Sequence, residues 1–107
     1  MDVSVLVPLF NEAESLPSLH AWIVRVMKEH ALSYEIVFVN DGSNDDSWQV
    51  IQSLREQDEH VKGICFRRNY GKSAALHCGF QMVQGDVVIT MDADLQDSPD
   101  EIPELYR

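Results

Sequence analysis

The chain has 107 residues, the size of one small domain, and its 8 Lys and Arg against 18 Asp and Glu give a formal charge of −10. A hydrophobic content of 45% excludes a disordered acidic tail, and the negative charge argues against nucleic acid as the main partner. No run approaches the roughly 18 apolar residues of a transmembrane helix, and the opening apolar run lacks the basic flank of a secretory signal.

Four β-rich runs recur along the chain and predict strands over residues 3–8, 34–39, 61–66 and 86–91. Apolar residues at helical spacing separate them and predict helices after residue 15, after residue 46, over 72–84 with Gly85 as a left-handed terminator, and from residue 101. The alternating order predicts an α/β fold: one domain over residues 1–107, with an open, mostly parallel sheet and helices on both faces.

The two cysteines, Cys65 and Cys78, stand in apolar surroundings without a CxxC pair or a Cys/His cluster. This usage predicts buried free thiols in a reducing compartment and no zinc site. We therefore expect a cytoplasmic location, or the cytoplasmic face of a membrane for a longer parent protein.

Each predicted strand is followed by a polar cluster, over residues 8–12, 40–43, 67–72 and 92–96. In open parallel sheets, ligands bind beyond the carboxyl ends of the strands, where the strand order reverses. Four polar clusters on one rim of the sheet therefore predict a binding site there.

The last cluster contains Asp92, Asp94 and Gln96, whose spacing of two places their side chains on one side of an extended segment. Two carboxylates and one amide oxygen suit a hard cation such as Mg²⁺ or Mn²⁺ that keeps positions open for phosphate oxygens. The competing interpretation is a capped turn before the helix that follows Pro99.

The first two clusters suit recognition of a base and a ribose. Asp41 offers a carboxylate to an imide-like N–H, Phe10 an aromatic wall, and Glu12 an acceptor for a hydroxyl. A plain strand-to-helix turn would also explain Asp41, and an acidic helix N-terminus would explain Glu12.

Three cations within residues 67–72 suit a diphosphate. No glycine precedes Gly71 by five residues, so a GxxxxGK[ST] phosphate loop is excluded. The sequence also lacks GxGxxG and GxSxG, which argues against nicotinamide cofactors and a serine-hydrolase elbow.

Four ordered motifs carry a family resemblance: V-x-V-x-V-P-L-x-N-E, Y-E-I-x-F-V-x-D-G-S, R-N-x-G-K-x-x-A-L and G-D-x-V-I-T-M-D-A-D-L-Q-D. Together they span residues 3–103 with the Ile102-Pro103 pair, and they resemble the family-2 glycosyltransferases of the GT-A fold. Within that family, the chain looks most like the dolichol-phosphate mannosyltransferase and bacterial polyprenyl-phosphate glycosyltransferase branch.

The resemblance implies roles for ten residues. Asp92 and Asp94 would be the catalytic pair, and Asp94 and Gln96 would hold the metal. The nucleotide would be bound by Pro8, Phe10, Glu12, Val39, Asp41, Lys72, Asp92 and Ala93.

The resemblance also implies an inverting, metal-dependent transfer of sugar from a UDP- or GDP-linked donor to a polyprenyl phosphate acceptor. Catalytic domains of this family are about twice as long, so we expect an N-terminal nucleotide-sugar-binding part that is inactive by itself. Membrane association would come from a later C-terminal part, and the exposed sheet edge could support a homodimer. Asn40, where many members have Asp, removes one charge but keeps an acceptor.

Two alternatives to this function remain at the level of sequence. A non-catalytic nucleotide-binding module would look the same in this chain. A receiver-type signalling domain shares the length, acidity and Mg²⁺ binding, but it needs a phosphorylated Asp after the third strand, where this sequence has Arg67-Arg68-Asn69.

Overall fold

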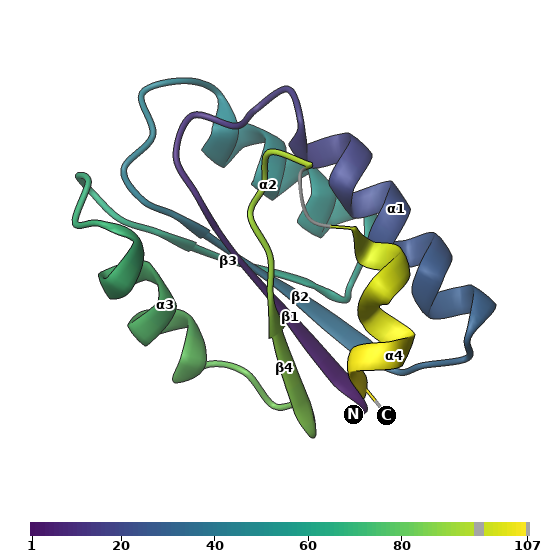
Figure 1. Cartoon of the computed structure of the whole chain (residues 1–107). Coiled ribbons are helices and arrows are strands. Elements are labelled where there is room, and N and C mark those ends of the chain that lie inside the picture. The colour runs from purple at the N-terminus through teal and green to yellow at the C-terminus, as the bar shows by residue number, and fades with distance from the viewer. Residues whose placement is uncertain (96–97, 107) are drawn as a thin grey trace.

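The structure is a computed structural model of the chain and describes residues 1–95 and 98–106. Figure 1 shows a single sheet with helices packed on its two faces. The elements in chain order are β1 (Val3–Leu9), α1 (Leu16–Glu29), β2 (Tyr34–Asn40), α2 (Ser47–Gln57), β3 (Val61–Cys65), α3 (Lys72–Phe80), β4 (Val87–Thr90), a 3₁₀ turn η1 (Pro99–Glu101) and α4 (Ile102–Tyr106).

The four strands form one sheet in the order β3-β2-β1-β4, and every neighbouring pair is parallel. The predicted strands are therefore confirmed, with ends that differ by one residue at β1, β2, β3 and β4. Strand order reverses between β1 and β4, because the chain first builds outward on one side of β1 and then returns to its other side. This reversal places the expected binding position at the carboxyl ends of β1 and β4.

Helices cover both faces of the sheet, as the sequence predicts (Figure 1). Helices α1, α2 and α4 lie on one face, where the larger core gathers side chains such as Val5, Ile23, Phe38 and Ile102. Helix α3 lies on the other face, over a smaller core that includes Leu6, Val37, Val39 and Ala75. Strands β1 and β2 are buried along their whole length, because the side chains on both faces of the sheet are covered there.

Helix α3 ends at Phe80, four residues before the predicted end, and Gly85 does not have a left-handed conformation. Gly85 instead lies against β1, where a Cβ would approach the Ser4 nitrogen to 2.6 Å. The prediction of a helix terminator at Gly85 is therefore wrong. The glycine is required by a close backbone approach, and the segment before it must leave the helix early to reach β1.

A buried carboxylate anchors that segment. Glu35 on β2 is 1% exposed, and its Oε2 accepts hydrogen bonds from the Gln84 backbone N–H at 2.6 Å and from Ser4 Oγ at 2.5 Å. Lys62 Nζ on β3 donates to Oε1 at 2.6 Å. Burial raises the pKa of Glu35, but the hydrogen bonds from Lys62, Ser4 and Gln84 outweigh that effect and leave its pKa below the ordinary value.

We expect Glu35→Gln to lower the free energy of unfolding at neutral pH by about 1–3 kcal/mol, because it removes the charge and replaces one of the two acceptor oxygens by an amide donor. The pKa of Glu35 is lower in the folded state, so its contribution is present above the unfolded value of about 4.3. That contribution is lost as the pH falls below this value through the folded pKa.

Denaturant unfolding measured across the acid range tests this expectation. The wild-type protein should lose stability more steeply with falling pH than Glu35→Gln does. Glu56→Gln, at an exposed position of α2, is the matched control and should keep the wild-type profile. Parallel acid profiles for wild type and Glu35→Gln would contradict the role of this carboxylate.

Candidate functional site

A cleft of about 270 Å³ opens at the carboxyl ends of the strands, beside the point where the strand order reverses. It is lined by Pro8, Leu9, Phe10, Asp41, Asn69, Gly71, Lys72 and Asp92. A smaller hollow of about 60 Å³ adjoins it, because Pro8, Lys72 and Asp92 also line that hollow together with the end of β4. The rim predicted from the four polar clusters is therefore hollowed at the expected place.

Asp41, directly after β2, forms the back of the cleft and is 5% exposed. Its carboxylate accepts the backbone N–H of Tyr70 at 2.8 Å and that of Gly71 at 3.0 Å. Asn69 Nδ2 donates to the Asp41 carbonyl at 3.3 Å. Each carboxylate oxygen keeps further acceptor capacity, so Asp41 both fixes the β3–α3 loop and faces the cleft.

Gly42 brings the same two loops into direct contact. Its φ is +71°, and a Cβ there would lie 2.2 Å from the Arg68 carbonyl carbon. Gly71, at the start of α3, also has a positive φ of +98°, but a Cβ there would meet nothing within 4 Å. Only Gly42 therefore combines a left-handed conformation with a steric need for the missing side chain.

Lys72 and Asp92 meet across the cleft. Lys72 Nζ, at the first residue of α3, donates to Asp92 Oδ1 at 2.8 Å, and both side chains are at least half exposed. An exposed ion pair contributes only about 0–1 kcal/mol to stability. A ligand with its own charges can therefore separate the two groups at little cost.

Phe10 and Glu12 lie on the loop between β1 and α1. The Phe10 ring is 41% exposed and lines the cleft. Glu12 lies outside the cleft lining, and its Oε2 is 2.9 Å from Ser15 Oγ at the start of α1. The loop is tied to the β2–α2 loop, because the Asn11 backbone N–H donates to Ser43 Oγ at 2.8 Å.

Two of the predicted nucleotide-binding residues, Val39 and Ala93, are buried and do not line the cleft. Val39 is 0% exposed and packs in the smaller core beneath α3, so only its main chain is left to meet a ligand. Ala93 is 3% exposed, and its carbonyl oxygen lies 2.6 Å from Ser15 Oγ. Ser15 thereby ties the segment after β4 to the start of α1.

The predicted metal ligands lie near this segment. Asp94 is exposed on the turn that follows Ala93 and is not part of the cleft lining, whereas Gln96 lies outside the described residues. Among the described residues, no group of three His, Cys, Asp or Glu side chains is arranged to hold a metal ion by itself. The roles of Asp94 and Gln96 as metal ligands, with Asp92 beside them, stay predictions.

The structure thus brings together five of the ten predicted residues, namely Pro8, Phe10, Asp41, Lys72 and Asp92. Asn69 also lines the cleft, although its residue type alone predicts no role there. The feature of the sequence that could have indicated Asn69 as a cleft residue is its position in the R-N-x-G-K motif.

The prediction of buried thiols is only partly right. The structure has Cys65 exposed and Cys78 half-buried, and both are free. Cys65 is the last residue of β3, an edge strand, so no neighbouring strand covers its outer side.

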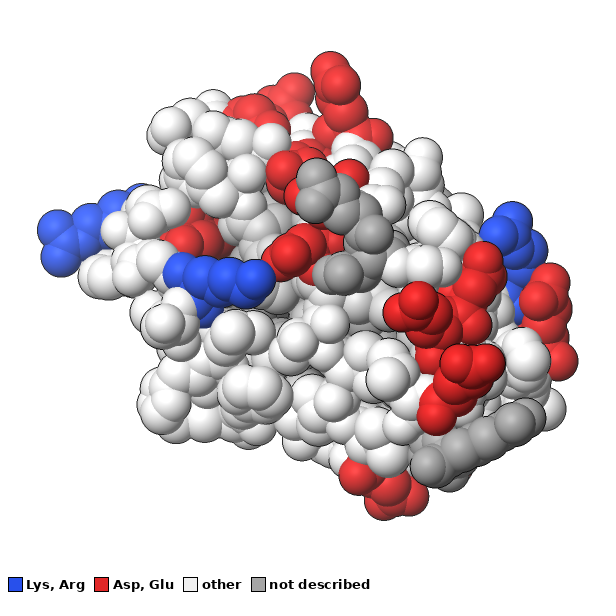
Figure 2. Space-filling model, viewed as in Figure 1, with Lys and Arg blue, Asp and Glu red and all other residues white. Residues whose placement is uncertain are grey.

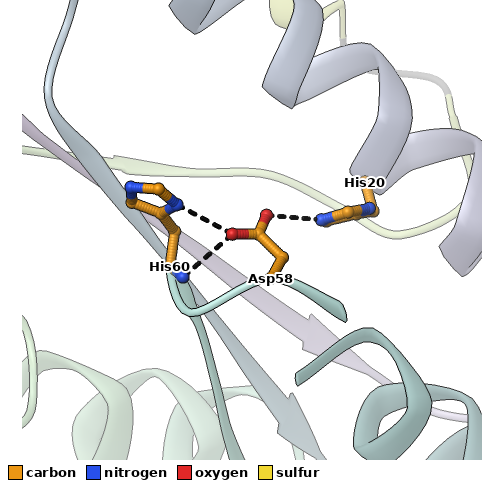
Figure 3. Close-up of polar contacts among 3 residues, drawn as sticks. All are labelled: His20, Asp58 and His60. Atoms are coloured by element: carbon orange, nitrogen blue, oxygen red, sulfur yellow. Dashed lines mark hydrogen bonds and ion pairs between the residues drawn. The ribbon is translucent and has the colours of Figure 1, made fainter. Parts of the chain in front are cut away.

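A separate polar cluster lies beside the start of β3, away from the cleft (Figure 3). Asp58 Oδ2 is 2.8 Å from His20 Nε2 on α1, and Oδ1 is 2.7 Å from His60 Nδ1. His60 also stacks on Tyr34 with ring centroids 4.4 Å apart. Burial raises the pKa of Asp58, but the bonds from His60 and His20 lower it below the ordinary value. The cluster connects α1 to the turn between α2 and β3, which indicates a structural role.

Two further hollows lie away from the strand ends. One of about 280 Å³ surrounds the His20–Asp58–His60 cluster. A larger one of about 530 Å³ is lined by Gln52, Arg55, Glu56, Glu59 and Val61. Neither contains any residue of the four polar clusters, so size alone does not identify the site.

Residues 4–107 match the family model described as glycosyl transferase family 2, and the chain therefore belongs to that family. Among curated proteins, it is 46% identical over 106 residues to the undecaprenyl-phosphate 4-deoxy-4-formamido-L-arabinose transferase of Pseudomonas fluorescens (strain SBW25) and 43% identical to the protein of the same name from Photorhabdus laumondii. These alignments cover 98% of this chain and 31% and 33% of the relatives. The chain thus spans about a third of the length of the curated relatives it matches.

Solved structures confirm the fold as that of GT-A glycosyltransferases. Mannosyl-3-phosphoglycerate synthase from Rubrobacter xylanophilus superposes with a TM-score of 0.78 at 20% identity, covering 98% of this chain and 35% of that one. The mannosyltransferase PcManGT from Pyrobaculum calidifontis, in complex with GDP-Man and Mn²⁺, gives 0.75 at 24% identity, covering 94% of this chain and 30% of that one.

We expect Gly42→Ala to destabilise the protein more than Gly71→Ala does. Both changes force an alanine into a positive φ, which costs about 1–3 kcal/mol, but only the Gly42 change also drives a Cβ into the Arg68 backbone. Chemical unfolding of the two variants measures the difference. Equal losses would mean that the two loops separate freely and that the close contact is not needed.

Proposed function

We propose that this chain is the nucleotide-sugar-binding N-terminal part of an inverting glycosyltransferase that uses a polyprenyl phosphate as acceptor. The observation that carries the proposal is the cleft at the strand-order reversal, where Asp41, Lys72 and Asp92 converge. The names of the relatives support undecaprenyl phosphate as the acceptor and 4-deoxy-4-formamido-L-arabinose as the first sugar to test.

The charges of the cleft suit a nucleoside diphosphate. The base would lie between the exposed Phe10 ring and the Asp41 carboxylate, which accepts an N–H from the base edge. Lys72 would turn from Asp92 to the diphosphate, because a phosphate oxygen offers the ammonium group a stronger charge than a half-exposed carboxylate. Asp92 would then face the ribose or the cation.

In the reaction, an oxygen of the acceptor phosphate forms a bond to the anomeric carbon as the bond from that carbon to the diphosphate breaks. The electron pair of the broken bond stays on the diphosphate, where Lys72 offsets the added charge. A divalent cation held through Asp94, with Gln96 and Asp92 nearby, would supply further charge neutralisation to the leaving group. An acceptor phosphate is already anionic, so this step needs little help from a general base.

We expect Asp94→Asn to abolish most of the coupling between metal and nucleotide binding. A cation bound between a carboxylate and a diphosphate makes each ligand bind more tightly in the presence of the other, typically by about 5–150-fold. Asp41→Ala should instead weaken nucleotide binding at every metal concentration, by about 1–3 kcal/mol. Calorimetric titration of GDP and UDP, with and without Mn²⁺, measures both effects.

Asp46→Asn, which removes a charge from an exposed position before α2, is the matched control and should leave the coupling unchanged. If Asp94→Asn keeps the full metal dependence, the segment after β4 is only a capped turn and the assigned metal ligand is wrong. Activity of the full-length parent separates a transferase from a non-catalytic nucleotide-binding module.

We place the parent enzyme at the cytoplasmic face of a membrane. Two free cysteines support a reducing compartment, and a polyprenyl phosphate acceptor is a membrane lipid. None of the helices in the described part of the chain is long and apolar enough to cross a bilayer. Membrane association through a later segment stays a prediction.

We also propose that β4 pairs with a second copy of the chain. In the described part, β4 pairs only with β1, so its outer edge presents backbone N–H and C=O groups to a neighbour. Wild type should form a dimer that Val88→Lys weakens, and Gln52→Lys on α2 serves as the charge-matched control. Sedimentation equilibrium measures this, and a wild-type monomer at every concentration would refute it.

A further inference from the structure

The loop between β3 and α3 concentrates basic and aromatic side chains on an otherwise acidic protein. Residues 66–72, called the basic loop below, contain three of the eight Lys and Arg residues of the chain. Arg67, Arg68 and Tyr70 are exposed, and Tyr70 has 55% of its surface accessible to solvent. Figure 2 shows basic side chains projecting at the left of this face, with some acidic surface beside them and most of the acidic side chains at the top and right.

The two arginines of the basic loop have no acidic partner. Neither Arg67 nor Arg68 forms an ion pair with any carboxylate in the described part of the chain. The Arg68 guanidinium lies over the Tyr70 ring, 4.9 Å from its centroid, and Tyr70 meets Phe66 edge-on at 5.6 Å. These contacts orient the Arg68 and Tyr70 side chains without neutralising charge.

The backbone of the basic loop is held in place by the two residues that follow β2. Asp41 accepts the N–H groups of Tyr70 and Gly71, and the Arg68 backbone packs on Gly42. A loop that is already ordered loses little conformational entropy when it binds a partner. The arginines and Tyr70 are therefore displayed on a rigid base.

Acidic groups near the basic loop are already compensated. The Asp41 carboxylate accepts two backbone N–H groups, and Asp92 is paired with Lys72. Neither arginine lines any of the four hollows described above. Exposed cations outside these hollows, next to an exposed tyrosine, match an extended anionic surface better than a single small anion. Tyrosine is also favoured where water meets a bilayer, because its ring is apolar and its hydroxyl is polar.

We propose that the basic loop docks on the headgroups of an anionic phospholipid membrane. The inference rests on the proposed function in one respect, namely that a lipid acceptor requires the donor cleft to approach a bilayer. The cleft and the basic loop share Asn69, Gly71 and Lys72, so docking of the loop turns the donor cleft toward the membrane that holds the acceptor.

Co-sedimentation of the chain with vesicles tests the proposal. We compare vesicles of phosphatidylcholine alone with vesicles that also contain phosphatidylglycerol, at an ionic strength of about 0.1 M, where the Debye length is about 10 Å. At that ionic strength, repulsion between the membrane and carboxylates more than about 10 Å away is largely screened, whereas arginines in contact with the headgroups still attract them. Wild type should bind only the anionic vesicles and should be released by added salt.

The variant Arg67→Gln/Arg68→Gln should lower the affinity for anionic vesicles by about 25-fold, because each basic residue at a membrane surface contributes about fivefold. Arg25→Gln/Arg55→Gln removes the same charge from exposed positions on α1 and α2 and should change the affinity little. Tyr70→Ser should also weaken binding. Thermal unfolding of each variant confirms that the fold is kept.

Three outcomes overturn the proposal. These are a wild type that binds no vesicles, an equal loss in both arginine pairs, and release by inorganic phosphate beyond that caused by chloride at the same ionic strength. The last would indicate a site for one phosphate group. GDP and UDP titrations with Mn²⁺ separate the two proposals: a chain that binds nucleotide but no vesicles refutes docking alone, and the reverse result refutes the nucleotide site alone.

Discussion

One buried carboxylate determines the shape of the candidate site. Asp41 directly follows β2, yet its two oxygens hold the backbone of the loop that follows β3. Hydrogen bonds to a charged acceptor are worth about 1.5–3 kcal/mol each and are costly to leave unmade in a buried place. The loop backbone is therefore fixed, and because α3 starts at Lys72, the backbone position from which the Lys72 side chain reaches Asp92 is fixed as well.

The two ends of the sheet carry different kinds of polar group. At the amino ends of the strands, Glu35 and Asp58 are enclosed by donors from neighbouring elements, and their pKa values are lowered by those bonds. At the carboxyl ends, Asp41 is buried and bonded in the same way, but Lys72 and Asp92 remain at least half exposed. Exchangeable contacts are thus found at the end where ligands of open parallel sheets bind.

The fold could be predicted from the sequence because each strand is a run of apolar residues between turn residues and each main helix repeats its apolar positions. The site could be predicted only in part. Both faces of β2 are covered, so a motif residue within the strand such as Val39 points into the core, while Asp41, beyond the end of the strand, reaches the cleft. The bonds of Glu35 to residues from three segments depend on tertiary contacts that no local pattern contains.

The central position of β1 has a consequence for how the chain is made. β1 is synthesised before the other three strands of this sheet, and its pairing with β4 joins Val3 to Val87. At about 5–20 residues per second, the ribosome needs roughly 4–16 seconds to complete the intervening stretch. During that interval, one edge of the most buried strand has no neighbour, so the nascent chain presents a long apolar edge to which other nascent chains or a chaperone can bind.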